Sequence, residues 1–444
     1  MESLPAQEYK ELKKRFRHAI WRGTGETHLI MREFPQVDFY DEIAYGVRNI
    51  CAYDGQCETG RGQYIFELIQ MSARQDELRA EVIRGLKEEC EESWNLTHLF
   101  ETAACFAEQG DEEMKQVIRS QYANQNMSCT SWAGESQILE LDGFDGLVFV
   151  AETKGRWLLE GKGDHVDSSD LNEVMAKDSK ADLRAELASV AEENIFVAAY
   201  LKELEKKVKE RDESKPRPRP WEKNKHLPMA ERILKRPRFF LHAKKLAQQA
   251  TDADAVQVAE KCLVETDLKK LNRYLQFFGY RPFPLDPVFL LDLAQSDKKK
   301  HRDIQFSVRG ALAKVQSNTV RVYAMARLQV TSRPGECIGM LERNYQEGDE
   351  VFLESLLQST HDEHAMEQFA QGLRSIYKAN PTPRCKGPLE LLYQKSNCAI
   401  CRFSVLKLLL ENDVLSDRIQ QEIEFDCYLD TRDLRPRTMS PSDA

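Results

Sequence analysis

The sequence predicts an all-α protein in which antiparallel helix pairs stack into a right-handed superhelix, an α-solenoid. Apolar residues recur every three or four positions along most of the 444 residues, which is the spacing of one buried helix face. Charged residues make up 31% of the chain, whereas glycine and proline number only 21 and 16, a balance typical of long solvated helices. No segment alternates apolar and polar residues as a half-buried strand does, and a single four-helix bundle cannot hold so many helices.

The N-terminal half, residues 1–213, is expected to form one helical-repeat region. Gly110 suits the end of one helix, and Asp111 suits the N-cap of the next. From Leu183 to Leu204 the spacing predicts one long helix that runs into a charged stretch. The apolar stripes that define the earlier helices are formed by Tyr9, Leu12, Phe16 and Ile20, by Ile43, Val47 and Ile50, by Leu78, Val82 and Leu86, and by Leu96, Leu99, Ala103 and Phe106.

A basic, proline-rich linker is predicted over residues 214–226. Its core, Lys-Pro-Arg-Pro-Arg-Pro at 215–220, cannot continue a helix, because alternating prolines remove amide donors and favour an extended spacer. A second helical-repeat region is expected over 227–433. The last residues, 434–444, are expected to form a disordered tail.

Helix starts in the second region are marked by capping residues. Thr251 and Asp254 have the spacing of a capping box, with Asp in place of the usual Glu or Gln. Asp267 is placed to cap the next helix. Asp286 and Pro287 suit the N-cap and the first position of the helix that follows.

Two segments of the second region resemble helices of HEAT and armadillo-type repeats. These segments are 308–313 (VRGALA) and 320–328 (VRVYAMARL). Such repeats place Val-Arg before small residues that allow close helix contact, and an Asp near the turn within the repeat, a role that Asp303 is placed to fill. The resemblance covers a few repeats and implies a curved stack of helix pairs with a concave binding face.

Composition places the protein in a reduced, cytoplasmic compartment. The eleven cysteines are spread along the chain and odd in number, which argues against a disulfide framework. The N-terminus has no secretory signal pattern, and no window approaches the roughly 18 to 20 apolar residues of a membrane span. We therefore expect a soluble protein with no membrane partner and no cofactor; the oligomeric state stays open.

The most informative charged feature is a basic segment over residues 215–245. It holds eleven lysines and arginines against two glutamates, a net charge of +9 in a chain whose total is −10. One interpretation is a contact for a phosphate backbone or an acidic partner, with Phe239 and Phe240 available for stacking or packing. The other, which we favour, is a solvated linker whose charge offsets acidic neighbours. The candidate binding residues are Arg217, Arg219, Trp221, Lys235, Arg236, Arg238, Lys244 and Lys245.

Cysteine spacing suggests one further candidate site. Cys398 and Cys401 have the separation of a metal knuckle or a redox pair, and Cys385 and Cys427 would complete four zinc ligands. The alternative is that these cysteines are small buried hydrophobes, because Cys401 opens an apolar helix. The alternative is favoured, so no metal is assigned.

Asp142 and Asp145 form a carboxylate pair at an expected break between helices. Such a pair can divide acid and base roles, but Asp-Gly pairs more often serve turns and caps. No catalytic residue is assigned.

Two classes of function remain open. The first is an interaction or scaffold protein that binds a protein partner on its concave face without catalysis. The second is a nucleic-acid-binding protein, or a DNA-lesion glycosylase of the HEAT-like kind, that uses the basic segment 215–245. The second rests on analogy of architecture, and no catalytic residue carries over.

Overall fold

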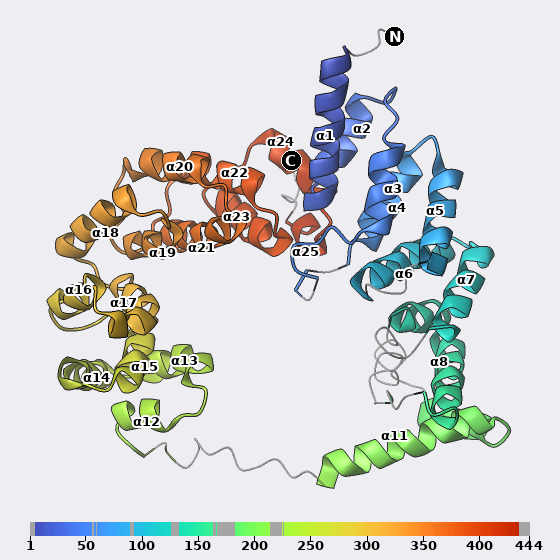
Figure 1. Cartoon of the computed structure of the whole chain (residues 1–444), viewed down its shortest axis with the longest axis horizontal. Helices are drawn as coiled ribbons and strands as arrows, with labels where there is room; N and C mark the ends of the chain where they lie inside the picture. The colour runs from blue at the N-terminus through green and yellow to red at the C-terminus, as the bar shows by residue number, and fades with distance from the viewer. Residues whose placement is uncertain are drawn as a thin grey trace, which may run out of the picture. The chain divides into compact units, whose positions relative to one another are not determined.

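A computed structural model describes residues 5–55, 57–58, 60–88, 93–125, 133–162, 166, 183–213, 224 and 226–434. All regular structure in these ranges is α- or 3₁₀-helix, with no strand, so the all-α prediction is confirmed (Figure 1). None of the helices in these ranges is long and apolar enough to cross a membrane.

Contacts divide the chain into two compact units. The first unit comprises residues 1–215, 397–400 and 416–444, and the second comprises 216–396 and 401–415. The C-terminal helices thus group with the N-terminal ones, whereas the sequence suggested one region over 227–433. The boundaries of the linker, 214–226, and of the tail, 434–444, stay predictions, because both segments lie almost wholly outside the described residues.

The first unit begins with six helices that pair with near neighbours in the sequence. They are α1 (Ala6–Arg22), α2 (Glu26–Glu33), α3 (Tyr40–Arg48), α4 (Gly62–Met71), α5 (Gln75–Glu88) and α6 (Ser93–Glu108). The unit continues with α7 (Glu112–Ala123), α8 (Glu135–Leu159), α10 (Leu183–Ala191), α11 (Ile195–Glu213), α24 (Asp417–Ile423) and α25 (Leu429–Arg432).

Packing in the first unit follows a regular rhythm. Helices two apart in the sequence contact each other, as in α1 with α3, α3 with α5 and α5 with α7, and a second series joins α4 to α6 and α6 to α8. The predicted stripes supply the core, since Phe16, Ile43, Val82 and Leu99 are all fully buried. Gly110 adopts positive φ and the Asp111 carboxylate accepts a hydrogen bond from the Met114 amide, which confirms both predicted helix boundaries.

The expected long helix from Leu183 to Leu204 is wrong. The chain turns at residues 192–194, between α10 and α11. The side-chain oxygen of Asn194 accepts hydrogen bonds from the amides of Phe196 and Val197, so Asn194 caps α11 instead of continuing the stripe. Asparagine competes for backbone donors in this way, which helical spacing alone does not reveal.

The expected break near Asp142 is a kink within one helical run. Gly143 leaves helical geometry inside α8, with φ 55° and ψ −121°, and helix resumes directly after it. Positive φ is a conformation that glycine adopts readily.

The second unit contains short helices joined by brief turns. They are α12 (Met229–Lys235), η2 (Phe239–Leu241), α13 (Ala243–Gln249), α14 (Asp252–Val264), α15 (Leu268–Phe278), α16 (Val288–Ala294), η3 (Lys299–Ile304) and α17 (Gln305–Leu312). The unit continues with α18 (Asn318–Val330), α19 (Gly335–Ile338), η4 (Gly339–Leu341), α20 (Asp349–Ser359), α21 (Glu363–Ala379), η5 (Pro383–Cys385), α22 (Lys386–Lys395) and α23 (Ala399–Glu411), whose first two residues group with the first unit.

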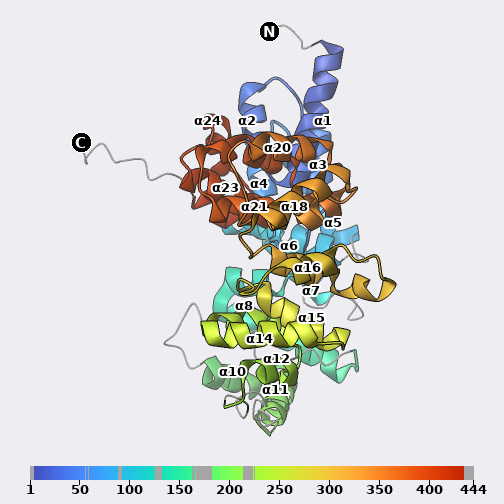
Figure 2. The ribbon, with the colours of Figure 1, turned by 90° about the vertical axis from the view of Figure 1, so that its left-hand side faces the viewer.

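Alternate helices of the second unit form a continuous row. Helix α13 contacts α15, α15 contacts α17, α17 contacts α19 and η4, and α19 contacts α21. We call these elements row A. The intervening helices pack beside it, with α14 on α15, α16 on α17 and α18 on α19, and Figure 2 shows them following one another from α12 through α14, α16 and α18 to α20.

The predicted caps at Thr251 and Asp267 form as expected, whereas α16 begins one residue later than predicted, with Pro287 at the N-cap. Thr251 and Asp254 make a complete capping box, and the Asp267 carboxylate accepts a hydrogen bond from the Lys269 amide. The Asp286 carboxylate accepts one from the amide of Val288, at the start of α16.

Candidate functional site

The second unit carries a groove along row A. Its volume is about 310 Å³ and it is open to solvent. It runs from the end of α15 across α17 to the α19–η4 turn and α21. The residues that line it are Gly279, Phe306, Arg309, Gly310, Ala313, Lys314, Gly335, Glu336, Gly339, Met340, Glu342, Gln368, Gln371, Gly372 and Ser375.

Two glycines leave the floor of the groove open. A Cβ atom at Gly310, inside α17, would have as its nearest neighbour the Cα of Gly279 at 3.9 Å, and a Cβ at Gly339 would meet no atom within 4 Å. Neither glycine has positive φ. Glycine costs a helix about 1 kcal/mol relative to alanine, so neither backbone geometry nor packing accounts for glycine at these positions.

Two other glycines of the groove are required by packing. A Cβ at Gly335 would lie 2.7 Å from Gln368 Cβ, and one at Gly372 would lie 2.2 Å from Ile338 Cγ2. These glycines let α19 and α21 approach closely. Small residues therefore serve close helix contact at Gly335 and Gly372, whereas the resemblance to HEAT repeats suggested that role at Gly310.

The charged walls of the groove are internally neutralised. Arg309 Nη2 lies 3.0 Å from Glu336 Oε2, and Lys314 forms an ion pair with Glu342. Both pairs are largely shielded from solvent, since no member has a side chain more than 28% exposed. Each cation is held beside an anion, so the groove offers little field to a strongly charged ligand.

Uncommitted polar groups and an exposed aromatic ring complete the site. Gln371 is exposed and Ser375 is half-buried; no side-chain hydrogen bond to either is found among the described residues. Phe306, at the start of α17, is 81% exposed. An apolar ring beside free hydrogen-bonding groups is the surface composition of small-molecule and peptide sites.

The structure places five of the eight candidate binding residues around one turn. Lys235 ends α12, Arg236 and Arg238 precede η2, and Lys244 and Lys245 lie on α13. We call residues 235–245 the basic turn. Phe239 is buried at 2% exposure and is not available for stacking, whereas Phe240 is 62% exposed. The other candidates, Arg217, Arg219 and Trp221, lie outside the described residues, and a role in binding stays a prediction for all eight.

The cysteine candidates do not form a recognisable metal site. Cys385, Cys401 and Cys427 are buried and Cys398 is partly buried. Cys398 and Cys427 group with the first unit, and Cys385 and Cys401 with the second. Across the ranges that the structure describes, no three His, Cys, Asp or Glu side chains gather as metal ligands. Burial raises the pKa of Cys385 to about 11, so this thiol is neutral near pH 7.

Asp142, one member of the carboxylate pair near the α8 kink, is held by two cations, whereas Asp145 is exposed. Asp142 pairs with Lys115, at 2.5 Å, and with Arg119. Burial acts to raise the pKa of Asp142, but hydrogen bonds from these two cations outweigh it and lower that pKa. A carboxylate held ionised between two cations does not act as a general acid or base near neutral pH.

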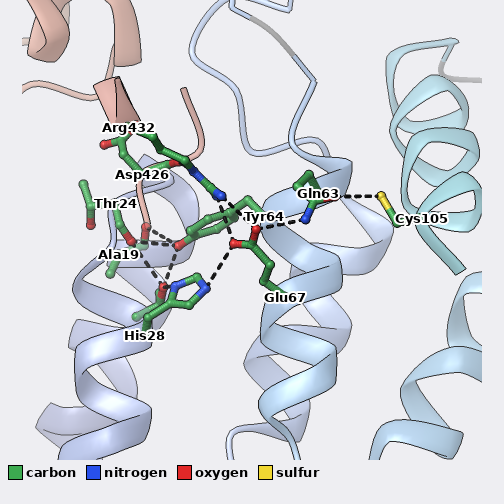
Figure 3. A network of polar contacts seen from close by, with 10 residues as sticks. Ala19, Thr24, His28, Gln63, Tyr64, Glu67, Cys105, Asp426 and Arg432 are labelled. Carbon is green, nitrogen blue, oxygen red and sulfur yellow. Dashed lines mark hydrogen bonds and ion pairs between the residues drawn. The ribbon is translucent and has the colours of Figure 1, made fainter. Parts of the chain in front are cut away.

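A buried polar network in the first unit escaped sequence reasoning. It joins α2 and α4 to the C-terminal segment 416–434 (Figure 3). The Tyr64 hydroxyl donates to the Thr24 carbonyl at 3.0 Å and lies 2.9 Å from the Thr27 hydroxyl, which in turn lies 3.2 Å from His28 Nδ1. On the other side of the ring, His28 Nε2 lies 3.4 Å from a Glu67 oxygen.

Glu67 is the centre of this network. It accepts two hydrogen bonds from Arg432, at 2.7 and 2.9 Å, and one from Gln63 at 2.9 Å. Burial acts to raise the pKa of Glu67, but the hydrogen bonds from His28, Arg432 and Gln63 lower it to about 2. Burial lowers the pKa of His28 despite the neighbouring carboxylate.

Further contacts fasten the same C-terminal segment. The Phe425 ring stacks on His28 with centroids 4.8 Å apart, and the Arg32 guanidinium lies over the same ring at 4.4 Å. The Cys427 amide donates to the Gly23 carbonyl at 2.8 Å. The contacts described for this network join protein groups of the first unit to one another. We therefore treat it as structural and call it the clasp, and the groove is the better candidate for a functional site.

Comparison with known proteins gives no relative. No family model matches the chain, and searches of curated proteins and of solved structures find no match. A function for the groove therefore has to be argued from the residues that line it.

Proposed function

We propose that the chain is a non-catalytic interaction protein whose second unit binds an extended segment of a protein partner in the groove along row A. The observation that carries this proposal is the open floor at Gly310 and Gly339. Glycine at a site where neither backbone nor packing needs it permits the main chain of a ligand to come close.

The chemistry of the groove favours a polypeptide over a polyanion. Arg309 and Lys314 are already paired with carboxylates, so phosphate groups would have to displace those partners. Gln371 and Ser375 offer donors and acceptors that suit peptide groups, and Phe306 offers an apolar contact. The alternative function, a nucleic-acid-binding protein or DNA-lesion glycosylase, depends on the basic turn. No feature of the groove supports it.

We further propose that row A is one layer of a HEAT- or armadillo-like solenoid. Support comes from the contacts between helices two apart in the sequence, which recur in both units. Each helix of such a stack buries its apolar stripe against its neighbours, while one row faces a ligand. The groove on row A is where this architecture would bind an extended chain.

A peptide selection with matched variants tests the proposal. Peptides are selected from a random phage-displayed library on the intact chain, and their affinity is measured by fluorescence anisotropy. Gly310→Leu fills the floor of the groove, and Phe306→Ser removes its exposed aromatic ring. Each variant should weaken peptide binding by about tenfold or more, which corresponds to a loss of about 1.4 kcal/mol in binding free energy.

Val330→Ser is the matched control for Phe306→Ser. Val330 ends α18, is 74% exposed and does not line the groove, so its removal should leave peptide affinity unchanged. Peptides that bind all three variants like the parent chain would refute the proposal. Failure to select any peptide, together with salt-sensitive binding of duplex DNA or RNA, would favour the alternative.

A further inference from the structure

The turn between α12 and α13 exposes two large apolar side chains side by side. Phe240 and Leu241 are 62% and 61% exposed, while Phe239 beside them is buried at 2%. Buried Phe239 anchors the 3₁₀-helix η2 and leaves its two neighbours in solvent. Adjacent exposed apolar side chains of this size leave apolar area in water that a contact surface would cover, and here they combine with a local excess of positive charge.

Cations surround this apolar tip. Lys235, Arg238, Lys244 and Lys245 are exposed, and the single acid from α12 to α13 is Glu231, which lies 3.5 Å from Lys235. Over the described part of the chain, no carboxylate lies within ion-pairing distance of Arg238, Lys244 or Lys245. The positive field is therefore not neutralised, in contrast to the walls of the groove.

The charges on this turn influence one another. Burial lowers the pKa of His242, and the neighbouring Arg236 and Lys245 lower it further. The same holds for Arg236, whose pKa is lowered by burial and then by Arg232.

The turn is also held in a fixed shape. The Arg273 guanidinium, on α15, donates to the carbonyl oxygens of Leu234 at 2.6 Å and of Arg236 at 3.2 Å. Arg238 occupies the left-handed region, with φ 46°, a conformation that non-glycine residues rarely adopt. Pre-ordering of the turn lowers the entropy that a partner would have to remove on binding.

We propose that the basic turn docks on an anionic lipid surface, with Phe240 and Leu241 entering the headgroup boundary and the surrounding lysines and arginines meeting the lipid phosphates and carboxylates. An apolar tip within a ring of cations matches the layered chemistry of such a surface. A nucleic acid would satisfy the cations and could stack on Phe240, but it has no apolar layer to cover Leu241. The binding is peripheral, needs no membrane-spanning helix, and departs from the expectation of no membrane partner.

Vesicle co-sedimentation of the intact chain tests this proposal. The probes are vesicles of phosphatidylcholine alone and of phosphatidylcholine mixed with phosphatidylserine. The chain should bind the mixed vesicles and not the neutral ones, and added salt should weaken the binding. Phe240→Ser with Leu241→Ser, and separately Lys244→Glu with Lys245→Glu, should each lower the partition coefficient by about tenfold or more.

Matched controls lie close by in the same unit. Leu263 and Val264, at the end of α14, are 45% and 73% exposed neighbours, so Leu263→Ser with Val264→Ser removes a similar apolar pair. Lys269 and Lys270, exposed on α15, give the matched charge reversal. Both control pairs should bind mixed vesicles like the parent chain.

Three outcomes would overturn the proposal. They are the absence of binding to mixed vesicles, an equal loss in test and control pairs, and binding to duplex RNA that Lys244→Glu with Lys245→Glu abolishes while no vesicle binding is seen. All substituted side chains are exposed, so thermal unfolding followed by circular dichroism should be unchanged. Peptide binding in the groove should also be unchanged, which separates this test from that of the proposed function.

Discussion

Arg432 donates two hydrogen bonds to the two carboxylate oxygens of Glu67, across 365 positions of sequence. This paired geometry fixes both the distance and the orientation of the two side chains. Helix α25 is thereby fastened to α4, and Phe425 and Cys427 extend the attachment to α2 and to Gly23. The first unit is thus completed by the far end of the chain.

Arg432→Gln should destabilise the first unit by about 2 kcal/mol, because Glu67 would remain partly buried without its main cation. Urea unfolding gives the magnitude, and amide hydrogen exchange should show the loss of protection concentrated in residues 416–434. Arg418→Gln is the control, since Arg418 and Glu33, the nearer of its two carboxylate partners, are more exposed and such pairs contribute about 0 to 1 kcal/mol. Equal losses in the two variants would contradict the role of the Arg432–Glu67 pair.

Acidification should weaken the clasp through His28. The pKa of His28 in the folded chain lies below its usual 6.5, so the unfolded chain takes up the proton first as pH falls. His28 therefore makes its full contribution to the free energy of unfolding above about pH 6.5. That contribution is lost as the pH falls toward the pKa of His28 in the folded chain. Glu67, with a pKa of about 2, adds a second loss below its usual pKa of 4.5.

The comparison of His28→Gln with the parent chain isolates the first effect. The variant should be less stable at pH 7, and the free energy of unfolding of the parent should approach that of the variant as pH falls from 7 to about 5. Urea unfolding at several pH values measures both curves. Parallel curves would show that His28 does not titrate as the structure indicates.

Glu101→Gln should stabilise the first unit at alkaline pH. Burial raises the pKa of Glu101 to about 7, with a smaller contribution from the charge of Glu140. Between pH 4.5 and 7 the unfolded chain ionises and the folded one does not, so this group lowers stability progressively, and fully so above pH 7. The gain in free energy of unfolding for the variant should be about 2 kcal/mol at pH 8 and near zero at pH 4. A gain that is the same at both pH values would contradict the raised pKa.

Alanine at two glycines of the groove should have opposite effects on stability. Gly310→Ala should raise the free energy of unfolding by about 0.5 to 1 kcal/mol, because alanine favours the helix and its Cβ meets open space. Gly372→Ala should lower it by about 1 to 3 kcal/mol, because its Cβ would overlap Ile338 and force the helices apart. Thermal or urea unfolding measures both changes. A loss of stability at Gly310 would show that the floor is not open.

Some residues that line the groove stand out in the sequence, but nothing in the sequence shows that they form a groove. Val308, Ala311 and Leu312 lie in the segment 308–313, which resembles repeat helices through its small residues, and all three are fully buried. Two signals pointed to the exposed side, namely Phe306 off the stripe and a glycine in mid-helix at Gly310. Neither could be joined to Gly339 or Gln371, because the spacing of residues within a helix says nothing about which other helix lies beside it.

The sequence by itself determined the all-α class of structure and several helix starts. Periodic apolar residues must be buried to leave water, and caps at Asp111, Thr251 and Asp267 satisfy amides that the helix leaves open; both effects act over a few residues and can be read locally. Only the tertiary structure decided that Gly310 faces open space and that Arg432 meets Glu67. These depend on contacts between residues far apart in the chain, whose energies arise only when the helices have packed.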